Sequence, residues 1–151
     1  MRTLQTGILL ILLIISKSIS GQLWKEYADS AKHYTESKNT AKAFDFYFRT
    51  REELKKDSLD TKTYAFYAHE LGRLYFNKNQ TTEAETCILE AKKIRQKLFT
   101  NNSPVYALSC ELLGRLYLRI NQLEKAEPLF FEVKKIRETD PGKLTADYAR
   151  S

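Results

Sequence analysis

The sequence has few residues that interrupt a helix: only five Gly and three Pro among 151 residues. Residues that favour helices, such as Lys, Glu, Leu and Ala, are frequent. This composition argues against a compact α/β fold and predicts an almost entirely helical protein. Because 42% of the residues are hydrophobic and 29% are charged, the chain is too apolar to be disordered.

The sequence is also poor in the groups that catalytic and metal sites use. Its two histidines, His33 and His69, have no zinc-type spacing to other ligands, and no glycine-rich phosphate loop is present. A Cys110–His69 nucleophile pair can be imagined, but a lone Cys and a lone His specify such a site poorly. We therefore predict no enzyme activity, no cofactor and no metal.

The net charge of +6 falls to +4 when Arg2 and Lys17 of the N-terminal segment are left out. The remaining basic and acidic residues alternate along the chain and form no basic run. This pattern is typical of a solvated helical surface and predicts no nucleic-acid partner.

Cys87 and Cys110 are the only cysteines in the sequence. An oxidising compartment would permit a disulfide between them. Both, however, fall within helical patterns at positions expected to face neighbouring helices, which favours two small buried thiols.

Residues 1–21 form a predicted signal peptide that is not part of the fold. Arg2 supplies a positive charge, residues 7–15 form an apolar run, and Ser18 and Ser20 are small residues at positions −3 and −1 of a cleavage site. The apolar run is far shorter than the roughly 20 residues that span a bilayer. We therefore expect a secreted or periplasmic protein without a stable membrane span.

An internal repeat organises residues 22–151. The segment Leu71–Tyr75 (Leu-Gly-Arg-Leu-Tyr) recurs at 113–117, an offset of 42 residues, and three more segments recur at the same offset. Four matches in register are not chance, and a weaker match at an offset of 41 extends upstream. The predicted units are about 22–60, 61–102 and 103–143, with the start of a further unit at 144–151.

Within each unit the apolar residues lie three or four positions apart, as on one face of a helix. Ser103 and Pro104 read as an N-cap followed by Pro at the first helical position. The predicted fold is all-α, an α-solenoid of antiparallel helix pairs with about three pairs and the start of a fourth. The expected helices are 23–37 and 40–56, 62–77 and 81–98, and 104–119 and 123–138.

These positions resemble the tetratricopeptide repeat, whose pattern W-x2-L-G-x2-Y is followed by Ala, Phe and Ala. The second unit matches it with Leu71, Gly72, Tyr75, Ala84 and Ala91, and the third repeats the first four of these at the offset of 42. The 42-residue length resembles the kinesin-light-chain subclass. The resemblance covers residues 22–151 and implies a scaffold for protein–protein interaction.

The resemblance also implies that the first helix of each pair lines a concave groove for a peptide or a partner protein. Carried over by position, the groove residues are Lys32, Phe66, His69, Arg73, Phe76, Asn77, Glu111, Arg115 and Arg119. Basic residues beside Phe66 and Phe76 would suit an extended acidic peptide with an apolar anchor. The alternative is that these charges are solvated or paired within the protein.

Two other functions stay open. Similar exported repeat arrays form the N-terminal sensory part of bacterial proteins that continue into a CHAT-type peptidase domain or a membrane signalling domain, which here would lie beyond residue 151. A stand-alone protein could instead self-associate through the face of its C-terminal repeat, where Leu129, Phe130 and Val133 lack a complete neighbour.

Overall fold

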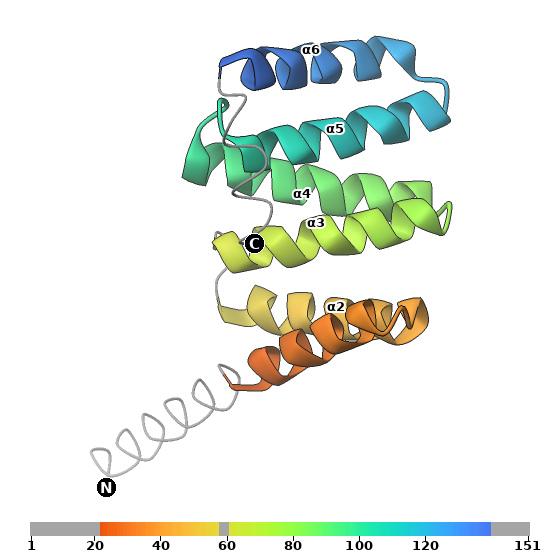
Figure 1. Ribbon diagram of the computed structural model, residues 1–151, viewed down its shortest axis with the longest axis vertical. Coiled ribbons are helices and arrows are strands. Elements are labelled where there is room, and N and C mark those ends of the chain that lie inside the picture. The colour runs from red at the N-terminus through yellow and green to blue at the C-terminus, as the bar shows by residue number, and fades with distance from the viewer. Residues whose placement is uncertain (1–21, 58–60, 140–151) are drawn as a thin grey trace, which may run out of the picture. The chain divides into compact units, whose positions relative to one another are not determined.

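A computed structural model of the chain describes residues 22–57 and 61–139 (Figure 1). These residues form helices joined by short turns, and they contain no strand. The predicted all-α fold of antiparallel helix pairs is confirmed. The expected signal peptide at 1–21 and the start of a further repeat at 144–151 lie outside the described residues.

The chain divides into two compact units, and the first is Met1–Leu59. Its described part holds a helical stretch at 22–36 followed by α2 (Thr40–Asp57). The turn between them uses Lys38 at a φ of 58°, a left-handed conformation that reverses the chain. Asn39 then accepts a hydrogen bond at its Oδ1 from a backbone N–H in the first turn of α2, at 3.2 Å, and so caps that helix.

Small and aromatic side chains hold this first pair together. Ala31 and Ala43 are almost completely buried, with 0% and 2% of their surface exposed. The rings of Tyr34 and Phe46 stack with centroids 5.4 Å apart and planes at 11°. The small residues let the two helices approach, and the stacked rings fill the space beside them.

The second unit, Asp60–Ser151, contains two further helix pairs. Its helices are α3 (Lys62–Asn77), α4 (Thr81–Phe99), α5 (Pro104–Arg119) and α6 (Leu123–Thr139). Within this unit, α4, α5 and α6 each run antiparallel to the helix before them, and the four helices are stacked in chain order (Figure 1). All eight helix ends agree with the sequence-based prediction to within one residue.

The two pairs of this unit begin and turn in the same way, 42 residues apart. Thr61 and Ser103 each accept a hydrogen bond from the backbone N–H three residues on, at 3.0 and 3.2 Å, and so cap α3 and α5. The predicted N-cap at Ser103 is thereby confirmed. Asn79 and Asn121 take φ values of 59° and 57° in the two equivalent turns, a conformation that Asn tolerates better than most residues.

The core of the second unit forms where each pair packs on itself and on the next. Gly72 of α3 faces Ile88 of α4, and Gly114 of α5 faces Phe130 of α6. Around these contacts a continuous apolar cluster spans all four helices. Its buried members include Phe76, Ala84, Ile88, Tyr106, Ala107, Cys110, Leu113, Leu116, Ala126, Val133 and Ile136.

The C-terminal repeat does not leave open the apolar face that the sequence suggested. Leu129 and Val133 are buried, with 7% and 3% exposed, and Phe130 packs against the same core. All three side chains point into their own repeat because they continue the stripe of α6 that faces α5. The large apolar side chains that α6 does expose are Leu123 and Phe131, with 58% and 69% of their surface accessible.

Candidate functional site

The residues predicted to line a groove lie on the first helices of the pairs. Lys32 is exposed on the helical stretch 22–36 of the first unit. The second unit carries the rest, with Phe66, His69, Arg73, Phe76 and Asn77 on α3 and Glu111, Arg115 and Arg119 on α5. The structure brings Phe66 and His69 together in a pocket, and it groups Phe76 with Arg115 and Arg119 elsewhere.

Arg73 forms an ion pair within its own helix. Its Nε and Nη2 donate to Oε2 of Glu70 at 3.0 and 2.7 Å. The two residues are three positions apart, so their side chains lie on the same face of α3. Part of the positive charge predicted for the groove is therefore offset by Glu70.

Arg119 and Phe76 connect two repeats. The Arg119 guanidinium carbon lies 3.5 Å from the centroid of the Phe76 ring, and Nη1 donates to the Phe76 carbonyl oxygen and to Oδ1 of Asn79. Phe76 is only 5% exposed and belongs to the core. Arg115, at 5.8 Å from the same ring, is exposed. Arg119 is exposed as well, but its guanidinium is held by these hydrogen bonds, so Arg115 is the better candidate to contact a ligand.

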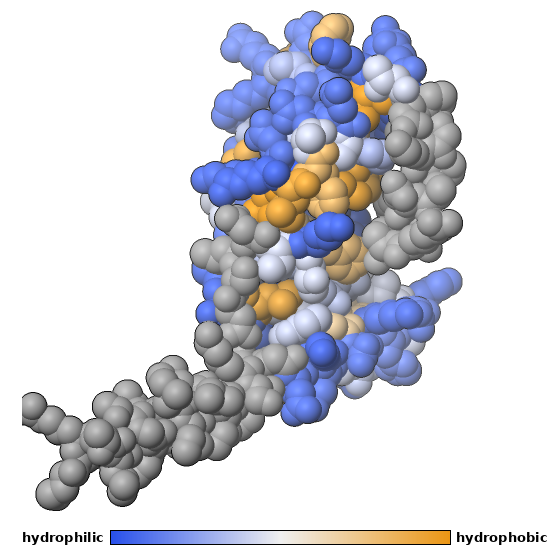
Figure 2. Space-filling model, turned by 90° about the vertical axis from the view of Figure 1, so that its left-hand side faces the viewer, coloured by the Kyte–Doolittle hydropathy of each residue, from blue (hydrophilic) through white to orange (hydrophobic). Residues whose placement is uncertain are grey.

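A pocket of about 530 Å³ lies between α3, the end of α4 and the start of α5. Figure 2 looks onto this end of the helices, where hydrophobic surface gathers between hydrophilic residues. Apolar and aromatic side chains form most of the wall, and Lys62, His69, Glu70 and Arg95 add charged or titratable groups to it. The lining residues are Lys62, Thr63, Phe66, Tyr67, His69, Glu70, Arg95, Phe99, Val105 and Leu108.

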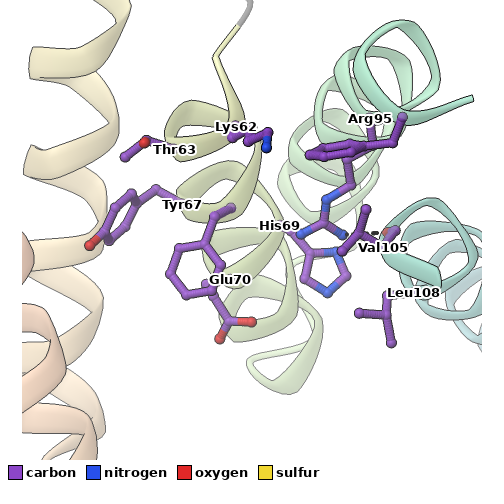
Figure 3. Close-up of a pocket in the computed structure, with 10 residues that line it drawn as sticks. Lys62, Thr63, Tyr67, His69, Glu70, Arg95, Val105 and Leu108 are labelled. Carbon is purple, nitrogen blue, oxygen red and sulfur yellow. Dashed lines mark hydrogen bonds between the residues drawn. The ribbon is translucent and has the colours of Figure 1, made fainter. Parts of the chain in front are cut away.

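Arg95 carries the buried positive charge of this pocket. Its side chain reaches from α4 to the His69 ring (Figure 3), and the residue is only 5% exposed. Nη1 donates to the Val105 carbonyl oxygen at 3.0 Å and to the Ser109 hydroxyl at 2.9 Å. Burial lowers the pKa of Arg95 to about 10, with the nearby Glu70 carboxylate acting in the opposite direction. The guanidinium therefore stays charged at neutral pH in a poorly solvated place.

His69 is the second polar group in the pocket wall. It is 8% exposed, and its Nδ1 is buried without a hydrogen-bond partner among the described residues. Burial, and then the charges of Arg95 and Arg73, hold the pKa of His69 well below 6.5. The imidazole is therefore neutral at physiological pH and adds no charge of its own.

The same two positions are filled differently in the next repeat. The offset of 42 relates Arg95 to Arg137 and His69 to Glu111. In the third repeat Arg137 Nη2 bonds directly to Oε2 of Glu111. In the second repeat a neutral imidazole stands where the carboxylate would be, so Arg95 has no counter-ion at that position.

Arg95, Phe99 and Val105 could not be recognised as site residues from the sequence. They lie on the end of a second helix and in the first turn of the next, whereas the groove pattern of the family concerns first helices only. One signal was available in the sequence. The segment Lys-Lys-Ile-Arg recurs at 92–95 and 134–137, so both repeats have the arginine, but the first helix has His69 in the second repeat where it has Glu111 in the third.

A separate polar cluster surrounds Glu132 on α6. Its Oε2 accepts hydrogen bonds from the Tyr106 hydroxyl at 2.9 Å and the Cys110 thiol at 3.3 Å, and Lys92 Nζ lies 3.9 Å away. Burial raises the pKa of Cys110 to about 12, so the sulfur is a poor nucleophile. Cys110 thus bonds to a carboxylate and makes no hydrogen bond to His69, and both it and Cys87 are buried and form no disulfide.

The described residues show two further absences. Within 22–57 and 61–139 no group of three or more His, Cys, Asp or Glu side chains is placed to hold a metal ion. None of the helices described in that same part of the chain is long and apolar enough to cross a membrane.

Comparison with known proteins places this geometry in context. The sequence pattern described as tetratricopeptide repeat matches residues 63–139. A search of curated proteins finds no match.

Solved structures with this fold include BtubC (BKLC) from P. vanneervenii, which is 21% identical in sequence with a TM-score of 0.75. The aligned region covers 84% of this chain and 53% of the BtubC chain. Two structures of a protein described as a kinesin light chain of Podosopora anserina with nearly identical TPR-like repeats, one of them a substituted variant, are also 21% identical, with TM-scores of 0.65. They cover 76% of this chain and 54% and 55% of theirs. The chain thus spans about half the length of these proteins, and at this identity the likeness shows the fold alone.

Proposed function

We propose that this chain, which belongs to the tetratricopeptide repeat family, binds an acidic peptide segment of a partner protein along α3 and α5. Repeats of this family generally serve as protein–protein interaction modules, and the chain is a scaffold of that kind. The matched residues are repeats, which are typically non-catalytic.

The observation that carries the proposal is the exposed Arg115 on the same helical face as the pocket. On α5, Leu108 lines the pocket and Arg115 lies seven residues further along, which is two turns on the same side. On α3, Phe66 and Arg73 have the same spacing. An extended peptide lying across these faces could place an apolar side chain in the pocket and carboxylates toward the guanidinium groups.

Selection of displayed random peptides on the full chain tests this proposal. We expect enriched peptides to combine Asp or Glu with one large apolar residue, and their affinity to fall as salt is added. Arg115→Glu should weaken binding by about tenfold or more, since it replaces an attraction by a repulsion. Arg115 suits this test better than Arg119, because Arg119 also bonds to the Phe76 backbone.

Lys93→Glu is the matched control. Lys93 is exposed on α4, away from the proposed peptide path, and its reversal changes the net charge by the same amount. Binding should be unaffected by it. Enrichment of basic or uncharged peptides, or equal losses in the two variants, would overturn the proposal.

Export of the protein is part of the same proposal and rests on the sequence of residues 1–21. Expression of the full chain in a secreting host should release a product that begins near residue 21, which intact mass measurement would detect. Retention of the full-length chain inside the cell would contradict it.

Two other predictions from the sequence are not tested by the described residues, although Leu129 and Val133, which were expected to provide a face for self-association, are buried in their own repeat. A sensory segment of a longer protein with a CHAT-type peptidase or a membrane signalling domain, and self-association of a stand-alone chain, both stay predictions. Assignment to the kinesin-light-chain subclass also stays a proposal, supported by the 42-residue offset in the sequence and by a fold like that of a kinesin light chain.

A further inference from the structure

Arg95 is a buried guanidinium for which the described residues provide no carboxylate within ion-pair distance. Its Nη1 donates hydrogen bonds to the Val105 carbonyl oxygen and the Ser109 hydroxyl. Its Nε and Nη2 bond to no side chain or backbone group in the described part of the chain. Buried charges are normally paired, because removing a charge from water costs several kcal/mol unless another charge or dipole compensates for it.

The third repeat shows how a carboxylate can pair with the arginine at this position. There the equivalent guanidinium, Arg137, is bound by the Glu111 carboxylate. In the second repeat the equivalent of Glu111 is His69, whose Nδ1 is itself buried without a partner in the described part of the chain. Buried polar atoms without partners are rare in folded proteins, and here two groups with unused hydrogen-bonding capacity line one pocket.

The rest of the pocket suits an apolar group. Phe66, Phe99, Val105 and Leu108 supply wall surface, and the volume of about 530 Å³ is within the range of small-ligand sites. The one carboxylate among the lining residues, Glu70, is bound by Arg73. The net charge facing the pocket is therefore positive.

We propose that this cavity, the His69–Arg95 pocket, binds a carboxylate carried on an aromatic or apolar body. The free N–H groups of Arg95 bind the carboxylate, the His69 imidazole adds one N–H donor, and the apolar body lies against Phe66 and Leu108. The same chemistry is found in a free aromatic acid and in the C-terminal carboxylate of a polypeptide that ends in an apolar residue. The inference does not require the proposed peptide-binding function, because a free acid alone would satisfy the pocket.

Titration of the full chain with 3-phenylpropionate tests the proposal. The uncharged 3-phenylpropionamide, which has the same apolar body, is the matched control ligand. The chain has two histidines, so the imidazole NMR signals of His69 report on the pocket and those of His33 serve as an internal control. We expect saturable shifts of the His69 signals with the acid and none with the amide. A peptide ending in Phe, compared with its C-terminal amide, distinguishes the two sources of the carboxylate.

The decisive variant is His69→Glu, which recreates the pair seen in the third repeat. A carboxylate at position 69 should bond to Arg95, raise the midpoint of unfolding and weaken binding of the acid by about tenfold or more. Arg95→Gln should also abolish binding, and Arg137→Gln, at the equivalent exposed site, should leave it unchanged. If Arg95→Gln fails to fold, His69→Glu still decides the matter, because it is expected to stabilise the protein.

The possible results separate this inference from the proposed function. Binding of the acid or of the free-carboxylate peptide that is lost in His69→Glu supports the pocket, whether or not acidic peptides bind along α3 and α5. Acid and amide binding equally, no binding of either the acid or the free-carboxylate peptide, or full binding retained in His69→Glu would overturn it. If neither the acid nor the free-carboxylate peptide binds, but acidic peptides bind in a way that depends on Arg115, the pocket inference is overturned while the proposed function is supported.

Discussion

Gly72 and Ile88 are in such close contact that no side chain fits between them: a Cβ atom at Gly72 would lie 2.7 Å from Cγ1 of Ile88. Ile88 is fully buried, and its branched side chain has little rotational freedom in a helix. Its backbone nitrogen would also lie 3.3 Å from the added atom. Glycine at this position therefore sets how closely α3 and α4 pack.

We expect Gly72→Ala to destabilise the protein by about 1–3 kcal/mol, although Ala favours a helix over Gly by about 1 kcal/mol. The overlap with Ile88 should outweigh the gain in propensity. Urea denaturation followed by circular dichroism measures the difference.

Gly114→Ala is the comparison at the equivalent site. There the added Cβ would meet the far end of the half-buried Phe130 ring at 3.0 to 3.2 Å, and no backbone atom is among its three nearest neighbours. The loss of stability should be smaller than at Gly72. An equal or larger loss would show that the contact with Ile88 does not control the packing.

The second prediction concerns the stability of the folded protein at acidic pH. Because the pKa of His69 is held well below 6.5 in the folded protein, the unfolded chain binds more protons. Stability should be constant above about pH 6.5 and decrease as the pH falls below that value, with a slope approaching about 1.4 kcal/mol per pH unit from this residue. Unfolding free energies between pH 5 and 7.5 measure it.

His69→Gln removes the titrating group and should flatten this part of the curve. Carboxylates contribute equally to both proteins, so the difference between the two curves isolates His69. Parallel curves for the variant and the natural protein would mean that His69 has the same pKa in the folded and unfolded states, which would contradict the prediction.

The third prediction concerns the stacking of the repeats. Arg119→Ala removes both the contact with the Phe76 ring and the hydrogen bond to the Phe76 carbonyl oxygen. We expect a loss of about 1–2 kcal/mol in unfolding free energy, because a partly exposed cation–π contact and the hydrogen bonds to Phe76 and Asn79 are removed together.

Arg115→Ala should change stability by less than about 0.5 kcal/mol, since its side chain is exposed and lies 5.8 Å from the ring. Similar losses for the two variants would indicate a general effect of charge and not a specific link between repeats.

The fourth prediction concerns the thiols. Cys110 is fully buried and burial raises its pKa to about 12, so at pH 8 almost all of it is the unreactive thiol. We expect Cys110 and the buried Cys87 to react with a disulfide reagent only after the protein unfolds. Rapid labelling of two thiols per chain under native conditions would contradict this prediction, and labelling in denaturant confirms that both are reduced.

Much of the fold could be predicted from the sequence because its signals are local and repeated. The stripe through Tyr64, Leu71 and Tyr75, together with the cap at Ser103, determines where helices lie and which faces they bury. The offset of 42 residues implies that each pair packs as its neighbour does. For α3 to α6 this reasoning reached every helix end to within one residue.

The candidate site depended on tertiary structure. Position in the family pattern suggested Phe76 as an exposed anchor, but the neighbouring repeat supplies Arg119 to cover it, and that contact joins residues 43 positions apart. Likewise, the sequence determines that position 69 is His where the next repeat has Glu111. Only the packing of α3, α4 and α5 shows that Arg95 lies beside it, because whether a charge is paired depends on distances and burial among side chains from three helices.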